Sequence, residues 1–124
     1  MIIGTILKKA VNAKTNRITF KERDVWWCKL GVNVGDEEDG KGSNSSRPVL
    51  VLKKFSQKLF VAIPLSTQIK DKDYYHKFEF KGKLQSVILT QIRLLDSKRL
   101  YAIMGRVASP DFKIIKDKVL KILS

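Results

Sequence analysis

The chain has 124 residues, of which 44% are hydrophobic, and this suits a single globular domain with its own core rather than a disordered chain. Its 25 Lys and Arg residues against 12 Asp and Glu residues give a net charge of +13, which favours nucleic acid, an anionic membrane surface or an acidic protein as the partner. Composition excludes a disulfide framework, because Cys28 is the only cysteine, and a membrane-spanning helix, because the longest apolar run, 59–65, is far shorter than about 20 residues.

The first part of the chain, 1–21, has weak hydrophobic patterning and is interpreted as an N-terminal arm. Ile6, Leu7 and Val11 could line one side of a short helix, but the small polar residues that follow break this pattern. The arm lacks a basic stretch followed by a long apolar one, so we expect no secretory signal and a reducing, cytoplasmic location. The segment 24–30 (DVWWCKL) then predicts a strand, because it is rich in aromatic and β-branched residues.

A polar loop follows this strand and carries four consecutive acids, 36–39, and then a Gly, Ser and Asn tract without apolar side chains. Such a composition is typical of a mobile loop. At its end Pro48 locks its own φ and holds Arg47 in an extended backbone, at the start of the next predicted strand, 47–54 (RPVLVLKK). The continuous apolar run of that strand predicts that both of its faces are buried.

Further strands are predicted where the apolar residues alternate. In 58–65 and 74–81 the residues predicted to share one face are Leu59, Val61, Ile63 and Leu65, and then Tyr74, His76, Phe78 and Phe80. Two more strands are predicted over 85–92 and 99–107, separated by a turn or a single helical turn over 95–99.

The last segment, 109–123, predicts an amphipathic helix. Ser109 is expected as its N-cap and Pro110 as its first residue, and a buried stripe is expected at Phe112, Ile115, Val119 and Ile122. Many short strands joined by short turns, with a helix at the end, predict one mainly β domain over 1–124 and argue against a βαβ fold. We expect a strongly curved antiparallel sheet or a small SH3-like barrel with a C-terminal helix.

The sequence contains little of the usual machinery for metal or cofactor chemistry. The acids 36–39 are adjacent rather than alternating, so they do not form a calcium loop, and a single Cys and a single His cannot form a zinc site. Glycine-rich phosphate loops are missing too, so no cofactor is expected. The lone His76 is interpreted as a partly buried ring within a strand.

A better candidate is a phosphate-binding set at two strand ends. Arg47 begins one predicted strand, and Ser66 and Thr67 close another, in the stretch IPLST. An arginine fork together with hydroxyl donors suits a phosphate group. The residues alone leave an ordinary interpretation open, with a solvated arginine and a serine and threonine in a turn.

Several stretches of the sequence resemble the MazF/PemK toxins of bacterial toxin–antitoxin systems. They are RDVWWCKLGVNVGDEEDGKG, RPVLVLKK, VAIPLST and SVILTQIRLLDSKRL, and together they cover about 22–107, with the predicted helix following. The resemblance implies a strongly curved β fold of the MazF/CcdB type and a homodimer. It also implies a metal-independent endoribonuclease that cuts single-stranded RNA at short sequences, and an antitoxin protein as partner, which we expect to be acidic.

The resemblance also implies roles for particular residues. Arg47 matches the catalytic arginine and Ser66 the catalytic threonine or serine, with Thr67 beside it as a substrate-binding residue. Gly35 and Glu37 match the Gly-x-Glu of the substrate loop, and Gln91 matches the Gln of Gln-Ile-Arg. The loop 37–47 is longer than in compact members, and Asp36 stands where some members carry Ser.

The implied mechanism is attack of the ribose 2′-hydroxyl on the adjacent phosphate, which leaves a cyclic phosphate. Arg47 would stabilise charge on the phosphoryl oxygens and Ser66 would donate a hydrogen bond to them. A guanidinium is a poor proton acceptor, so the general base is unassigned, with Glu37 as a candidate. Two alternatives remain open: a CcdB-like toxin that targets gyrase, and a basic nucleic-acid-binding module without catalysis.

Overall fold

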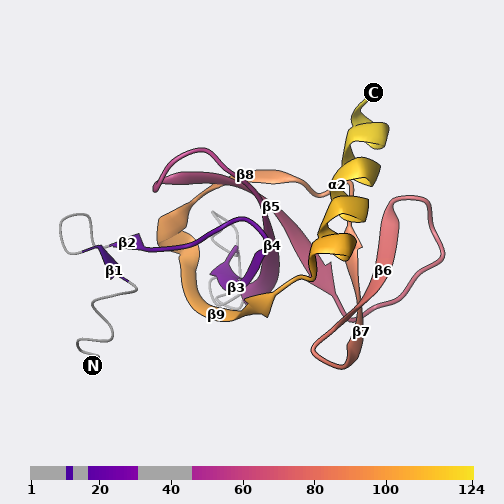
Figure 1. The fold of residues 1–124 in the computed structure, drawn as a ribbon, viewed down its shortest axis with the longest axis horizontal. Helices are drawn as coiled ribbons and strands as arrows, with labels where there is room; N and C mark the ends of the chain where they lie inside the picture. The colour runs from indigo at the N-terminus through magenta and orange to yellow at the C-terminus, as the bar shows by residue number, and fades with distance from the viewer. Residues whose placement is uncertain (1–10, 13–16, 31–45) are drawn as a thin grey trace, which may run out of the picture.

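The computed structural model describes residues 11–12, 17–30 and 46–124. Labelled as in Figure 1, its elements are β1 (Val11–Asn12), β2 (Arg17–Ile18), β3 (Asp24–Lys29), β4 (Ser46–Lys54), β5 (Leu59–Ser66), β6 (Tyr75–Phe80), β7 (Lys83–Ile88), β8 (Arg93–Asp96), the 3₁₀ helix η2 (Ser97–Arg99), β9 (Leu100–Arg106) and α2 (Ser109–Leu123). The short strands β1 and β2 pair with each other and lie on the far side of the molecule from α2 (Figure 1).

The other strands form one seven-stranded antiparallel sheet in the order β6–β7–β5–β4–β3–β9, with β8 paired to β5 outside this path. β5 changes partner along its length, because 59–62 pair with β8 whereas Leu65 and Ser66 pair with β7. Register shifts between β3 and β9 and between β4 and β5 add local twist. The sheet is strongly curved, with α2 against one side (Figure 1), which confirms the predicted mainly β fold with a C-terminal helix.

The central strands are buried on both faces because their alternate side chains enter two separate cores. In β4, Leu50 and Leu52 belong to the first core, whereas Val49 and Val51 belong to the second. The helix covers the first core with three side chains, those of Phe112, Ile115 and Val119. The second core contains Phe20, Trp26, Cys28, Phe60, Ala62, Leu95 and Leu100. The predicted burial of both faces of 47–54 is therefore confirmed at its apolar run.

The observed strands differ from the sequence-based expectation at three places. The strand predicted over 85–92 ends at Ile88, where a turn begins in which the Gln91 amide donates to the Ile88 carbonyl at 3.0 Å. β8 was not predicted, because its four residues contain only one buried apolar side chain and so have no readable period. Leu59 and Tyr74 are each 41% exposed, because they lie at or just outside the ends of their strands.

Predictions about the two ends of the chain also need correction. The N-cap of α2 is Ala108, without a side-chain hydrogen bond, because Ser109 already belongs to the helix. Ile122 is 40% exposed, since the last turn of α2 extends beyond the strands (Figure 1). Val11 lies in a strand rather than a helix, and Phe20, assigned to the arm, is buried in the second core against Phe60. Ile6 and Leu7 lie outside the described residues.

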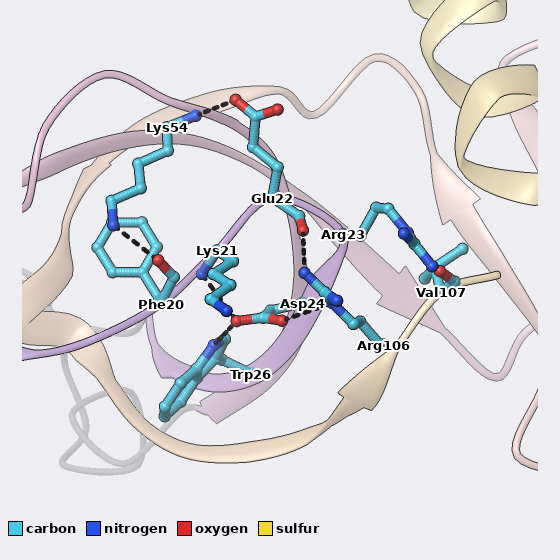
Figure 2. A network of polar contacts seen from close by, with 9 residues as sticks. All are labelled: Phe20, Lys21, Glu22, Arg23, Asp24, Trp26, Lys54, Arg106 and Val107. Carbon is cyan, nitrogen blue, oxygen red and sulfur yellow. Dashed lines mark hydrogen bonds and ion pairs between the residues drawn. The ribbon is translucent and has the colours of Figure 1, made fainter. Parts of the chain in front are cut away.

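A buried carboxylate holds the start of β3 in place (Figure 2). Asp24 is only 6% exposed; its Oδ2 accepts from the Lys21 amide at 2.8 Å and from the Trp26 indole at 3.2 Å, and its Oδ1 lies 3.3 Å from the Arg106 Nε. The preceding residue, Arg23, has a φ of +82° and donates from Nε to the Val107 carbonyl at 3.0 Å. These contacts join β3 to the end of β9, and so fix the direction in which β3 runs toward the pocket described next.

Candidate active site

The start of β4 and the end of β5 meet at the rim of a cavity of about 340 Å³. Val49 pairs with Pro64 across these two antiparallel strands, so continuing the register by two residues places Arg47 opposite Ser66, on the same face. The cavity is lined by both residues and also by Trp27, Thr67, Gln68 and Gln85. Its volume lies within the range of about 300–1,000 Å³ that is usual for ligand pockets.

Arg47 supplies an unpaired positive charge to this cavity. Its side chain is half-buried and, within the described ranges, makes no ion pair or side-chain hydrogen bond. In the pairing of β3 with β4, Arg47 lies opposite Cys28, and the adjacent residue pair is Trp27 and Pro48. An arginine fork that is held by a strand and has no side-chain partner among the described residues is well suited to bind an anionic oxygen pair.

Ser66 is positioned so that its hydroxyl can donate. The Gln68 amide donates to the Ser66 Oγ at 3.0 Å, so the hydroxyl acts as an acceptor there and keeps its own proton for another group. The turn is fixed from the other side by Ser86, which is fully buried and whose Oγ donates to the Gln68 carbonyl at 2.8 Å. Arg47 and Ser66 are therefore two donors that line the same cavity, which is a suitable arrangement for a phosphate group.

The structure does not bring all the predicted site residues together. Thr67 lines the cavity, with an exposed side chain, but Gln91 is exposed on the turn after β7 and does not line it. Gly35 and Glu37 lie outside the described residues, as do all four acids 36–39. Among the described lining residues there is no carboxylate, imidazole or thiol, so the general base stays unassigned.

The sequence analysis missed several of the lining residues, among them Trp27 and Gln85. Gln85 is in phase with Val87 and Leu89, which are buried in the first core, so a polar residue at an apolar position was a signal that could have been read. Trp27 gave no such signal, because the sequence does not show which of the two adjacent tryptophans faces the cavity. The β3–β4 register pairs Trp27 with Pro48, next to Arg47, and the sequence alone does not show this register.

The only histidine and the only cysteine lie outside the lining of this cavity. His76 is half-buried, stacks on Phe78 with ring centroids 6.4 Å apart, and has its Nδ1 3.0 Å from the Lys118 Nζ. Burial and, secondly, the charge of Lys118 lower the pKa of His76, so its neutral form is favoured. Burial raises the pKa of Cys28 to about 11, although Arg99 and Arg93 oppose this effect, so its thiol is protonated at neutral pH.

Within the ranges that the structure describes, no group of three or more His, Cys, Asp or Glu side chains is arranged as metal ligands would be. In the same part of the chain, no helix combines the length and the apolar character needed to span a bilayer.

The fold and the cavity define a small basic β domain with an arginine-lined pocket at the ends of its central strands. The family model of the PemK-like, MazF-like toxins of type II toxin–antitoxin systems matches residues 21–123, and the chain belongs to this family. The resemblance found in the sequence motifs is thereby confirmed. No curated protein matches the sequence significantly.

Solved structures share the fold, and 57 of their chains match significantly. An endoribonuclease in complex with its cognate antitoxin, from a mycobacterial species, is 16% identical with a TM-score of 0.67, and the match covers 85% of this chain and 95% of that one. MazF from Deinococcus radiodurans is 17% identical with a TM-score of 0.63, covering 82% and 94%. The Mycobacterium tuberculosis toxin MazF-mt6 is 11% identical with a TM-score of 0.62, covering 82% and 96%. At these identities the likeness shows the fold alone.

Proposed function

We propose that this toxin is a cytoplasmic endoribonuclease that cleaves single-stranded RNA at short sequences without a metal ion. The observation that carries the proposal is the cavity where Arg47, which has no partner among the described residues, lies opposite Ser66, whose hydroxyl proton is free to donate. The family membership supports the same activity, and one solved structure with this fold is of an endoribonuclease.

In the proposed reaction the ribose 2′-hydroxyl attacks the adjacent phosphorus, and the bond to the 5′ oxygen of the next nucleotide breaks. The products are a 2′,3′-cyclic phosphate and a free 5′-hydroxyl, so no water enters this step. Negative charge grows on the two non-bridging oxygens in the transition state, and there the fork of Arg47 and the hydroxyl of Ser66 would bind most strongly. The proton of the 2′-hydroxyl needs an acceptor, and Glu37 remains the candidate. The leaving 5′ oxygen takes up one proton in return, so the step is balanced.

The charge of the chain fits a polyanionic substrate. With 25 basic residues against 12 acidic ones, RNA is attracted over a long range and its counterions are released on binding. Affinity for RNA should therefore fall steeply as salt is raised, with a slope of about −0.7 per neutralised phosphate of a single strand.

The same charge suits an antitoxin with an acidic inhibitory segment. We propose that this segment covers the Arg47 cavity and the loop 36–46, and that the toxin acts as a homodimer. The structure of an endoribonuclease with its cognate antitoxin supports the existence of such a partner for this fold. Electrostatic attraction predicts that association with the antitoxin is faster at low salt.

The proposal is tested by incubating purified protein with pooled single-stranded RNA in excess EDTA. We expect cleavage that continues in EDTA and stops when the ribose at the cut site is replaced by deoxyribose, because the nucleophile is then missing. Activity that requires Mg²⁺, or equal cleavage of the deoxyribose substrate, would contradict the mechanism. RNA binding without cleavage would favour a non-catalytic module, and inhibition of gyrase without cleavage would favour the CcdB-like alternative.

A further inference from the structure

One polar side chain in the cavity has no function in the proposed cleavage step. Gln85 of β7 is only 7% exposed, and its amide makes no side-chain hydrogen bond in the part of the chain that the structure describes. A buried amide without a partner costs free energy, because its donors and acceptor have lost their water. Such groups are rare in native proteins, and each one requires a physical explanation. A ligand that enters the cavity would provide the missing partner.

The position of Gln85 relative to the cleavage pair follows from the strand order. The adjacent strands β7, β5, β4 and β3 all contribute to the cavity, and among their lining residues are Gln85, Ser66, Arg47 and Trp27 in that order. Ser66 pairs with Ser86, so Gln85 is next to the strand position that pairs with Ser66. The phosphate-binding pair therefore lies on the two inner strands, and the amide and the indole lie on the two outer strands. Gln85 and Trp27 are each one residue out of phase with that pair, so their side chains leave the strands on the opposite face, and all four residues line the cavity at the strand ends.

The four strands together are wide enough to contact more than one nucleotide. Neighbouring strands are about 4.8 Å apart, so the four strands span about 14 Å, whereas stacked nucleotides of one strand are roughly 3.4 Å apart. Groups on the outer strands can thus reach the nucleotides on either side of a phosphate that is held by the inner strands. Proteins recognise single-stranded RNA by stacking aromatic rings on unstacked bases and by hydrogen-bonding the edges of those bases.

We propose that Gln85 determines sequence specificity by hydrogen-bonding the edge of an adenine next to the scissile phosphate, while Trp27 stacks on the nucleotide on the other side. An amide presents an acceptor beside a donor, and adenine presents its N6 amino group beside the acceptor N7, so the two form a matched pair. Guanine presents two acceptors, O6 and N7, on that edge and satisfies only the donor of the amide. The inference rests on the proposed ribonuclease function and adds to it the base that is recognised.

The test begins by mapping the sites that the wild-type protein cleaves in pooled RNA. An oligonucleotide centred on a mapped site is then prepared with adenine at the flanking position, with purine, which lacks the N6 amino group, or with 7-deazaadenine, which lacks the N7 acceptor. We expect the wild-type protein to cleave the adenine substrate about tenfold or more faster than either analogue, because one good bidentate pair gives discrimination of that order.

Two variants of Gln85 separate recognition from folding. Gln85→Met has similar length and no hydrogen bonds, and it should cleave the three substrates at nearly equal rates. Gln85→Glu retains an acceptor for N6 but meets N7 with a second acceptor, so 7-deazaadenine should become a better substrate than adenine. An effect on folding alone would lower all three rates together. The matched control is Gln57→Met, in the exposed turn between β4 and β5, which should retain the wild-type preference.

The outcomes distinguish this inference from the proposed function. If the wild-type protein cleaves no RNA, the proposed function is wrong. If it cleaves RNA but adenine is not required on either side of the cut, or if Gln85→Met retains the full preference for adenine, the inference is wrong and the ribonuclease function is unaffected.

Discussion

Replacing the buried carboxylate of Asp24 by an amide, in the variant Asp24→Asn, tests what holds β3 in place. The amide has the same shape, and its oxygen can still accept from the Lys21 amide and from the Trp26 indole, now 2.8 and 3.2 Å from Oδ2. Its NH₂ group must then face the Arg106 Nε, which lies 3.3 Å from Oδ1. A charge-assisted contact is thereby replaced by two donors that face each other.

The expected loss follows from these contacts and from the exposure of the ion pair. A hydrogen bond to a charged group contributes about 1.5–3 kcal/mol. The Arg106 side chain is 47% exposed, so solvent screens the contact, and we expect the lower part of that range, about 2 kcal/mol. Asp24→Ala also leaves the buried Trp26 indole N–H without an acceptor, which adds about 1–3 kcal/mol, so it should cost about 4 kcal/mol in total.

The assay is urea unfolding followed by tryptophan fluorescence, with the free energy of unfolding extrapolated to water. The matched control is Asp71→Asn, because Asp71 pairs with Lys77 at the same 3.3 Å but with its side chain 92% exposed. That change should cost less than about 0.5 kcal/mol, as is usual for surface ion pairs. Equal effects of Asp24→Asn and Asp71→Asn would refute the argument that burial and the three partners of Asp24 stabilise the start of β3.

Three further predictions concern the cavity, the backbone and the histidine. Arg47→Lys and Arg47→Ala should each lower the cleavage rate at least about 100-fold, which corresponds to about 2.7 kcal/mol of transition-state stabilisation. The lysine variant is included because lysine retains the charge but not the planar fork. A near-normal single-turnover rate for the lysine variant would show that a point charge is sufficient. In urea unfolding, Arg23→Gly should be more stable than Arg23→Ala by about 1 kcal/mol. Both variants lose the hydrogen bond to the Val107 carbonyl, but only glycine adopts the φ of +82° without strain. The reverse order of stability would exclude backbone strain at this position. Because the pKa of His76 is lowered in the folded protein, the unfolded chain takes up the proton first as pH falls, so the free energy of unfolding should decrease below about pH 6.5. His76→Gln should flatten this part of the stability profile, and an unchanged slope between about pH 8 and about pH 5.5 would assign it to other groups.

Much of the fold was predictable because the signals are local. β4 and α2 were found from short windows, since a continuous apolar run indicates a strand buried on both faces and a 3.6-residue period indicates an amphipathic helix. Pro48 fixes the backbone around Arg47 in the same local way. β8 was missed because its formation depends on its partner: a strand with one buried apolar residue exists only through its pairing with β5.

The candidate site also contains residues that local sequence signals predicted and residues that only the tertiary structure revealed. The sequence placed Arg47 at the start of one strand and Ser66 at the end of the next, and neighbouring antiparallel strands bring such ends together. It did not show that Gln85 and Trp27 line the same cavity, or that Gln91 stays outside it. Those positions depend on the β5–β7 and β3–β4 registers and on the curvature of the sheet. Pairings between residues that are distant in the chain determine both the registers and the curvature. The burial of the Gln85 amide is likewise decided by what packs around it, so only the tertiary structure could reveal it.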